Sequence, residues 1–113
     1  MTRCPSPAVF LSKELQDYLE GLDDDNKIKK WIEDMTNVLG EHMYSGDLIG
    51  KKLIPDYYIT RYGVNNLYRY SHPEGFRSCY TIFKEEGIGV CPHVLDIMSH
   101  EEYEKRFGYR KSR

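Results

Sequence analysis

The feature that most constrains the fold is a change of hydrophobic period near residue 50. Before this point, apolar residues recur at the spacing of one helix face. The clearest set is Ile28, Trp31, Ile32, Met35, Val38 and Leu39. Residues 11–22 show the same period, with Ser12 as a candidate N-cap and Gly21 as a stop. The short acidic connection between these two segments predicts an antiparallel helical hairpin.

After residue 50 the chain favours strands. Residues 66–71 and 76–83 are rich in aromatic and β-branched side chains, and the turn sequence 72–75 separates them. This pattern predicts a β-hairpin. Residues 88–97 predict a third strand, in which Pro92 calls for a bulge or an edge position because proline cannot donate to the ladder.

The C-terminal part carries a helix-start signal. Ser99 and Glu102 have the spacing of a capping box, and Gly108 supplies a stop about two turns later. The whole pattern predicts an α+β fold, in which an N-terminal antiparallel helical hairpin packs on one face of a small antiparallel β-sheet meander, followed by a short C-terminal helix. We expect residues 1–8 to be a tail and residues 9–113 to be a single domain. The sheet face without helices is then the place for function.

Composition excludes several classes of protein. The longest apolar stretches are only a few residues long and the N-terminus lacks the apolar core of a signal peptide, so we expect a cytoplasmic protein that does not enter a membrane. Three scattered cysteines do not make a disulfide framework. Zinc-type ligand spacing, a phosphate-binding loop and a dinucleotide fingerprint are all missing from the sequence, which predicts neither a metal nor a cofactor.

The charge balance is informative only when the chain is divided. The net charge of -2 argues against a nucleic-acid-binding protein, because phosphate contacts usually require a basic excess. Residues 1–50, however, carry 5 basic and 10 acidic side chains, a net of -5, while residues 51–113 carry 11 basic and 8 acidic ones, a net of +3. The second half therefore remains compatible with an anionic partner.

The predicted hairpin presents a candidate binding face. A symmetric pairing about the turn places Tyr70 opposite Arg77 and Tyr68 opposite Cys79, with Arg69 on the other face; a shift of one residue would exchange the two sets. An arginine flanked by tyrosines can bind a phosphate while the rings stack on bases, as in single-stranded nucleic-acid binding. The alternative, which the pattern alone favours, is that these side chains simply cover a solvated sheet.

Further candidates lie on either side of this hairpin. Basic residues that could contact RNA, or could simply be solvated, are Lys51, Lys52, Lys105, Arg106 and Arg110. His100 and Tyr103 are three residues apart on the predicted C-terminal helix and can address one reaction centre. The alternative is that His100 is an exposed first-turn residue and Tyr103 a packing residue.

The order of these motifs resembles a known superfamily. The residues that carry the likeness are Asn66-Leu67-Tyr68-Arg69-Tyr70, Gly75-Phe76-Arg77-Ser78-Cys79-Tyr80-Thr81-Ile82, Val94-Leu95-Asp96-Ile97, and His100-Glu101-Glu102-Tyr103. They resemble the RelE/ParE-like toxins of bacterial and archaeal type II toxin-antitoxin modules. The segments 51–58 and 105–109 are most similar to those of archaeal members.

The resemblance implies a fold and a chemistry. It implies a concave sheet with two N-terminal helices on its other face, and cleavage of messenger RNA by attack of the ribose 2′-hydroxyl on the adjacent phosphate. By the same resemblance, Arg77 would bind the scissile phosphate and Arg69 would be a second cation. His100 would act as acid or base, and Tyr103 would stack on a base or transfer a proton. Two departures are Tyr68 and Tyr70, which stand where RelE has lysines.

We therefore expect the toxin component of a toxin-antitoxin module: a metal-independent messenger RNA endoribonuclease (mRNA interferase) that inhibits translation. Its expected partners are a cognate antitoxin and messenger RNA, free or on the ribosome. The superfamily also includes gyrase poisons and members without activity. The alternative is accordingly a non-catalytic interaction module that keeps the fold and binds a protein or a nucleic acid.

Overall fold

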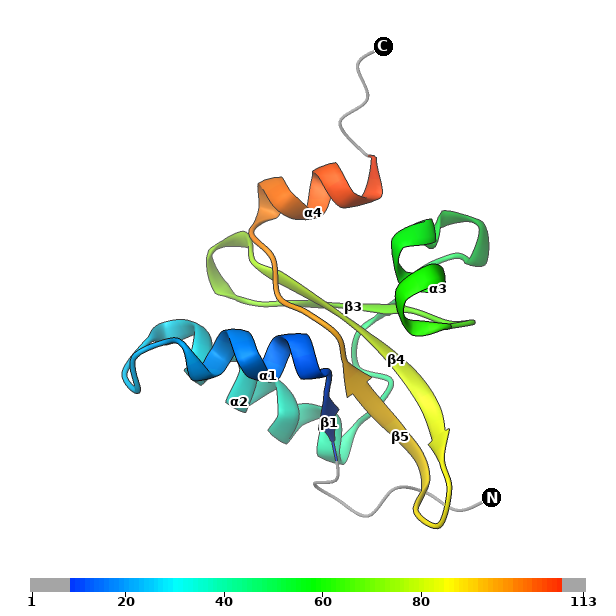
Figure 1. Ribbon diagram of the computed structural model, residues 1–113, viewed down its shortest axis with the longest axis horizontal. Coiled ribbons are helices and arrows are strands. Elements are labelled where there is room, and N and C mark those ends of the chain that lie inside the picture. The colour runs from blue at the N-terminus through cyan, green and yellow to red at the C-terminus, as the bar shows by residue number, and fades with distance from the viewer. Residues whose placement is uncertain (1–8, 109–113) are drawn as a thin grey trace.

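The computed structural model describes residues 9–108 (Figure 1). Its elements are β1 (Phe10–Leu11), α1 (Lys13–Glu20), α2 (Lys27–Glu41), β2 (Asp47–Leu48), α3 (Asp56–Tyr62), β3 (Tyr68–Ser71), β4 (Arg77–Glu85), β5 (Gly89–Val94) and α4 (His100–Phe107). Two 3₁₀ turns, η1 (Lys51–Leu53) and η2 (Pro73–Gly75), lie in the connections. The predicted α+β class is confirmed. The tail predicted for residues 1–8 lies outside the described residues.

The sheet is larger and more varied than the predicted meander. Its strand order is β1-β5-β4-β3-β2, and β1 runs parallel to β5 while the other neighbours are antiparallel. The expectation of a purely antiparallel meander is therefore wrong. The two additional strands, β1 and β2, are two residues long each, which is too short to leave an alternating pattern in the sequence.

The N-terminal helices start where their caps predict. The Ser12 hydroxyl accepts a hydrogen bond from the Leu15 amide, and the Asn26 side chain accepts one from the Ile28 amide. α1 and α2 run in opposite directions beside the sheet (Figure 1). Their apolar stripes meet one sheet face in a core made of Leu15, Ile32, Met35, Leu39, Tyr80 and Val94.

The second sheet face is also covered, by α3 and α4. A second core on this face consists of Ile49, Ile54, Tyr58, Leu67, Cys79, Leu95, Met98 and Tyr103. The expectation that the helices pack on one face only is wrong: the predicted helix α4 packs on the second face, and so does α3, which the sequence pattern does not predict. Pro55 precedes α3, and Gly63 ends it in the left-handed conformation at φ 66°. These two residues are the available start and stop signals.

The β3–β4 register differs by one residue from the predicted one. Arg69 pairs with Cys79, and Ser71 pairs with Arg77. One sheet face therefore carries Arg69 and Arg77, whereas Tyr68 and Tyr70 lie on the opposite face. The predicted grouping of the tyrosines with Arg77 is wrong.

The cause of this shift is the turn. Glu74 and Gly75 both have positive φ, at 61° and 79°, and the His72 amide closes the turn by donating to the Phe76 carbonyl. Phe76 thereby leaves the strand, and its ring packs 5.3 Å from that of Trp31 on α2. Five residues, rather than the predicted four, connect β3 to β4. Every residue pair between the two strands is therefore shifted by one position from the predicted register.

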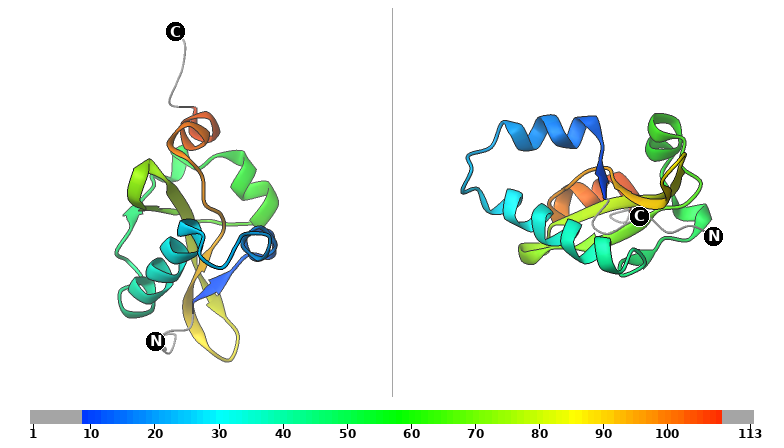
Figure 2. Two further views of the ribbon diagram at one scale, coloured as in Figure 1. Left: turned by 90° about the vertical axis from the view of Figure 1, so that its left-hand side faces the viewer. Right: turned by 90° about the horizontal axis from the view of Figure 1, so that it is seen from below.

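β5 continues past its last ladder residue toward α4. Pro92 pairs with Ile82 in an uninterrupted register, so no bulge is present, and β1 pairs only with the two residues that follow it. Pro92 thus occupies an edge position, as one of the two predicted options required. Figure 2 shows α4 at one end of the molecule and the β4–β5 turn at the other.

Candidate functional site

The candidate site lies where the β3–β4 turn meets the first turn of α4. An isolated antiparallel bridge joins Arg77 and Met98, each amide donating to the other's carbonyl over 2.8 Å. Ser99 follows directly and caps α4 through the predicted capping box with Glu102, which the structure confirms. The bridge and the cap together place His100 beside Arg77, the first residue of β4.

Arg77 contacts three groups, and none of them carries a negative charge. Its Nη1 donates to the Gly75 carbonyl and to His100 Nδ1, each over 2.9 Å, and its guanidinium carbon lies 5.2 Å from the Tyr103 ring centroid. Arg77 is half-buried, and it is the only half-buried cation within residues 9–108 that has no ion pair. Burying a charge without a counter-ion is costly, so this position favours an anionic ligand.

His100 is bound through both ring nitrogens. Nδ1 faces Arg77, and Nε2 lies 2.8 Å from a Glu104 carboxylate oxygen one turn further along α4. A guanidinium has only donors, so Nδ1 must be the accepting nitrogen in this contact. The His100 side chain is 55% exposed, which leaves the imidazole accessible to a substrate.

Arg69 lies on the same sheet face as Arg77 but is neutralised. It donates to Asp47 over 2.8 Å. This hydrogen bond raises the pKa of Arg69, burial opposes the rise, and the nearby Tyr103 hydroxyl adds to it. Tyr103 therefore lies between the two arginines. Its own ring is 2% exposed and stacks on Phe107, so it supports Arg77 and offers no free face to a base.

Both arginines, Arg69 and Arg77, keep a buried Nε without a hydrogen bond of good geometry to the described residues, although the Tyr103 hydroxyl lies near Arg69. Buried donors are almost always satisfied in folded proteins, by protein, water or ion. The two orphan donors on one sheet face are a second indication that this region binds a polar or anionic group.

The remaining RNA-binding candidates do not gather at this site. Tyr68 and Tyr70 pack against the core beneath α2, with Tyr68 stacked 5.1 Å from Tyr80. Lys51 and Lys52 are exposed on η1. Lys51 lines a surface pocket with Asn65 and Asn66, before β3, whereas Arg77 pairs at the other end of that strand.

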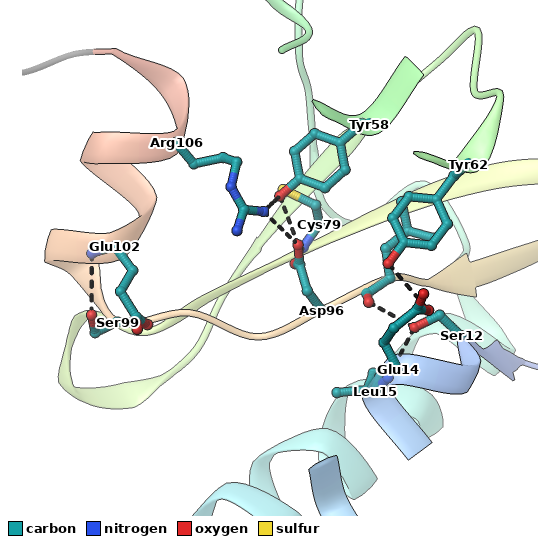
Figure 3. Close-up of polar contacts among 11 residues, drawn as sticks. Ser12, Glu14, Leu15, Tyr58, Tyr62, Cys79, Asp96, Ser99, Glu102 and Arg106 are labelled. Carbon is teal, nitrogen blue, oxygen red and sulfur yellow. Dashed lines mark hydrogen bonds and ion pairs between the residues drawn. The ribbon is translucent and has the colours of Figure 1, made fainter. Parts of the chain in front are cut away.

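Arg106 is used inside the protein. It donates to the Tyr58 hydroxyl over 3.1 Å and forms an ion pair with Asp96 at 3.5 Å (Figure 3). Its guanidinium carbon also lies 3.8 Å from the Tyr57 ring centroid. Burial raises the pKa of Asp96, while Tyr58, the Cys79 amide and Arg106 counteract that rise. These contacts connect α4 to α3 and to the segment that follows β5.

Of the two other basic residues predicted to contact RNA near the C-terminus, Lys105 is exposed on α4, and Arg110 lies outside the described residues. The structure also adds two residues that the sequence reasoning missed, Glu104 at His100 and Asp47 at Arg69. The spacing of four between His100 and Glu104 on a predicted helix is the signal that could have revealed the first.

Searches of the chain against protein-family models, curated proteins and solved structures found no match. The family resemblance therefore rests on the sequence motifs given above.

Within residues 9–108, no helix has the length and apolar content needed to span a bilayer. The same residues contain no group of three or more His, Cys, Asp or Glu side chains placed to hold a metal ion.

Proposed function

We propose that this chain is the toxin component of a type II toxin-antitoxin module, of the RelE/ParE-like type, and cleaves messenger RNA in the cytoplasm without a metal. The observation that carries the proposal is Arg77, a half-buried cation that has no ion pair with any of residues 9–108 and contacts the imidazole of His100. The position of α1 and α2 on the opposite sheet face also agrees with the resemblance.

The chemistry follows from these two side chains. Arg77 binds the scissile phosphate and stabilises the charge that develops on it, and His100 moves a proton. The nucleophile is the ribose 2′-hydroxyl of the substrate itself, so the protein does not need a nucleophilic side chain. Tyr103 supports the Arg77 guanidinium from below.

The test compares Arg77→Ala with Arg61→Ala in a translating extract that contains a labelled messenger. Arg61 is an exposed arginine paired with Glu14 on α1, away from the site, and serves as a control of equal charge change. We expect Arg77→Ala to lower the cleavage rate about 100-fold or more, as for loss of a donor to a developing anion, and Arg61→Ala to leave it unchanged. Equal cleavage by wild type and Arg77→Ala, or none by either, would refute the proposal.

The surface around Arg77 and α4 would also bind the partner protein, the antitoxin. A cognate antitoxin would bind as an acidic or amphipathic segment over the site and α4, and fold as it binds. Co-expression with the adjacent reading frame and purification of the toxin chain should recover the pair. A chain that purifies alone and is harmless to the host would contradict this assignment.

One observation favours the second candidate, a non-catalytic interaction module. The second cation, Arg69, is neutralised by Asp47, which leaves a single unpaired arginine at the site. A module of this kind would bind its partner without any cleavage. The same extract separates the two candidates, because a binding module would leave the messenger intact while still being retained on its partner.

A further inference from the structure

The carboxylate of Glu104 lies directly beside the His100 imidazole. His100 Nε2 and Glu104 are 2.8 Å apart at i and i+4 on α4. The helix that carries both is fixed at its start by the capping box and at its end by Gly108 in the left-handed conformation, φ 71°. The Glu104 side chain is 29% exposed against 55% for His100, so the acid is the more firmly placed of the two.

The proton positions follow from the partners. Arg77 can only donate, so in this contact His100 Nδ1 accepts and the neutral ring carries its proton on Nε2. Because the His100 side chain is 55% exposed, water can replace Arg77 at Nδ1, and the Arg77 contact alone does not fix the tautomer. Nε2–H in turn donates to the Glu104 carboxylate. The charged groups around the ring are Arg77 from β4 and Glu104 from α4. Glu74 of the adjacent turn is occupied by an ion pair with Lys27 at 2.7 Å.

We propose that Glu104 is a positioning residue, which holds His100 in the Nε2–H tautomer so that Nδ1 is the basic atom directed at the phosphate held by Arg77. This inference rests on the proposed function. A carboxylate behind an imidazole fixes both the tautomer and the ring orientation, and it stabilises the imidazolium that forms when the ring accepts a proton.

In the proposed cleavage reaction, Arg77 first transfers its Nη1 hydrogen bond from His100 to the phosphate, which frees the lone pair of His100 Nδ1. The ribose 2′-oxygen forms a bond to phosphorus, and its proton passes to Nδ1. The bond from phosphorus to the 5′-oxygen breaks, and that oxygen takes a proton from water. His100 then returns its proton to the hydroxide, leaving a 2′,3′-cyclic phosphate and a 5′-hydroxyl.

The first measurement needs no activity. The full chain is labelled with ¹⁵N-histidine, and long-range proton–nitrogen spectra are recorded at alkaline pH for wild type, Glu104→Ala and Glu101→Ala. The signals of His100 are assigned with His100→Asn. Glu101 is exposed on the same helix and provides the matched loss of charge. We expect the Nε2–H pattern in wild type and Glu101→Ala, and a mixture of tautomers in Glu104→Ala.

The second measurement is the cleavage rate in the same extract. Glu104→Ala should be slower than wild type by about tenfold or more, but less impaired than His100→Ala, because a positioning residue contributes less than the base it positions. The double variant should be no slower than His100→Ala, since Glu104 acts through His100. Unchanged unfolding in urea separates this loss from misfolding.

The outcomes distinguish the two proposals. A mixed tautomer in wild type, an unchanged tautomer in Glu104→Ala, or cleavage by Glu104→Ala at the wild-type rate would overturn the role of Glu104 and leave the proposed function intact. A wild-type protein that shows the Nε2–H tautomer but cleaves no messenger would overturn the proposed function, and with it the catalytic part of this inference.

Discussion

At the scale of single residues, burial separates the histidines of this chain. His100 is more than half exposed and lies between two charged groups. His72 is 7% exposed, contacts the Ser78 hydroxyl through Nε2 at 2.8 Å, and stacks near Trp31 and Tyr70. The same side chain is therefore a candidate proton carrier at one position and a packed core residue at the other.

The burial of His72 makes a prediction for stability. Burial lowers the pKa of His72 to about 4 from its ordinary value of 6.5. Between these two pH values the unfolded chain binds a proton that the folded chain rejects, so the free energy of unfolding should fall as the pH falls from about 6.5 to about 4. The full effect is about 3 kcal/mol.

The measurement is urea unfolding at several pH values for wild type, His72→Gln and His42→Gln. His42 is exposed at the end of α2 and serves as the control. His72→Gln should be less stable at pH 7 because the core is altered, but its stability should depend less on pH. If the three curves stay parallel between pH 6.5 and pH 4, His72 is not the group that titrates.

At the scale of elements, α4 is placed by a buried polar network as well as by apolar packing. Tyr58 of α3 donates to Asp96 over 2.7 Å and accepts from Arg106, and the other Asp96 oxygen accepts from the Cys79 amide. One aspartate thus connects α3, β4 and α4. Since α4 carries His100, this network also helps to position the candidate site.

Neighbouring tyrosines allow a matched test of this network. Tyr58→Phe removes the hydroxyl and leaves the buried carboxylate of Asp96 with one donor fewer, which should lower the free energy of unfolding by about 1–3 kcal/mol. Tyr57 is exposed on the same helix, and its hydroxyl has no hydrogen bond to the described residues, so Tyr57→Phe should change stability by less than about 0.5 kcal/mol. Urea unfolding measures both, and equal values would show that the network contributes nothing.

The elements that the sequence predicts are those with local signals. α1, α2 and α4 each carry a cap or an apolar period within their own residues, and these signals were sufficient. α3 is seven residues long and contains three tyrosines, one isoleucine and one threonine, a composition that favours a strand. Its helical form is stabilised by the burial of Tyr58, a tertiary contact that no local pattern encodes.

The candidate site depends on register, which is less predictable. His100 and Arg77 could be selected as residue types, but Arg69 was assigned to the wrong face because the turn contains one residue more than the pattern indicates. That extra residue is set by the packing of Phe76 on Trp31, which are 45 positions apart in the sequence. A sequence pattern contains no information on such a distant contact.

At the scale of the whole molecule, ion pairs connect the acidic first half of the chain to the basic second half. The first half has a net charge of -5 and the second half +3. Glu14 pairs with Arg61, and Asp47 pairs with Arg69, so acids of the first half neutralise cations of the second. The basic surface left for RNA is smaller than the charge count suggests, and Arg77 is its half-buried member.

This distribution makes a quantitative prediction for salt dependence. On single strands, the logarithm of the binding constant falls with the logarithm of the salt concentration by about 0.7 for each phosphate contacted. With Arg77 as the contact and Arg69 neutralised by Asp47, we expect a slope of about -0.7 for a 2′-O-methyl RNA, which binds but cannot be cleaved. Arg77→Ala should bring the slope close to zero, and Lys51→Ala should not change the wild-type slope. A wild-type slope steeper than about -3 would mean that the exposed lysines and the C-terminal arginines bind phosphates together. The binding surface would then extend well beyond Arg77 and His100, where the β3–β4 turn meets α4.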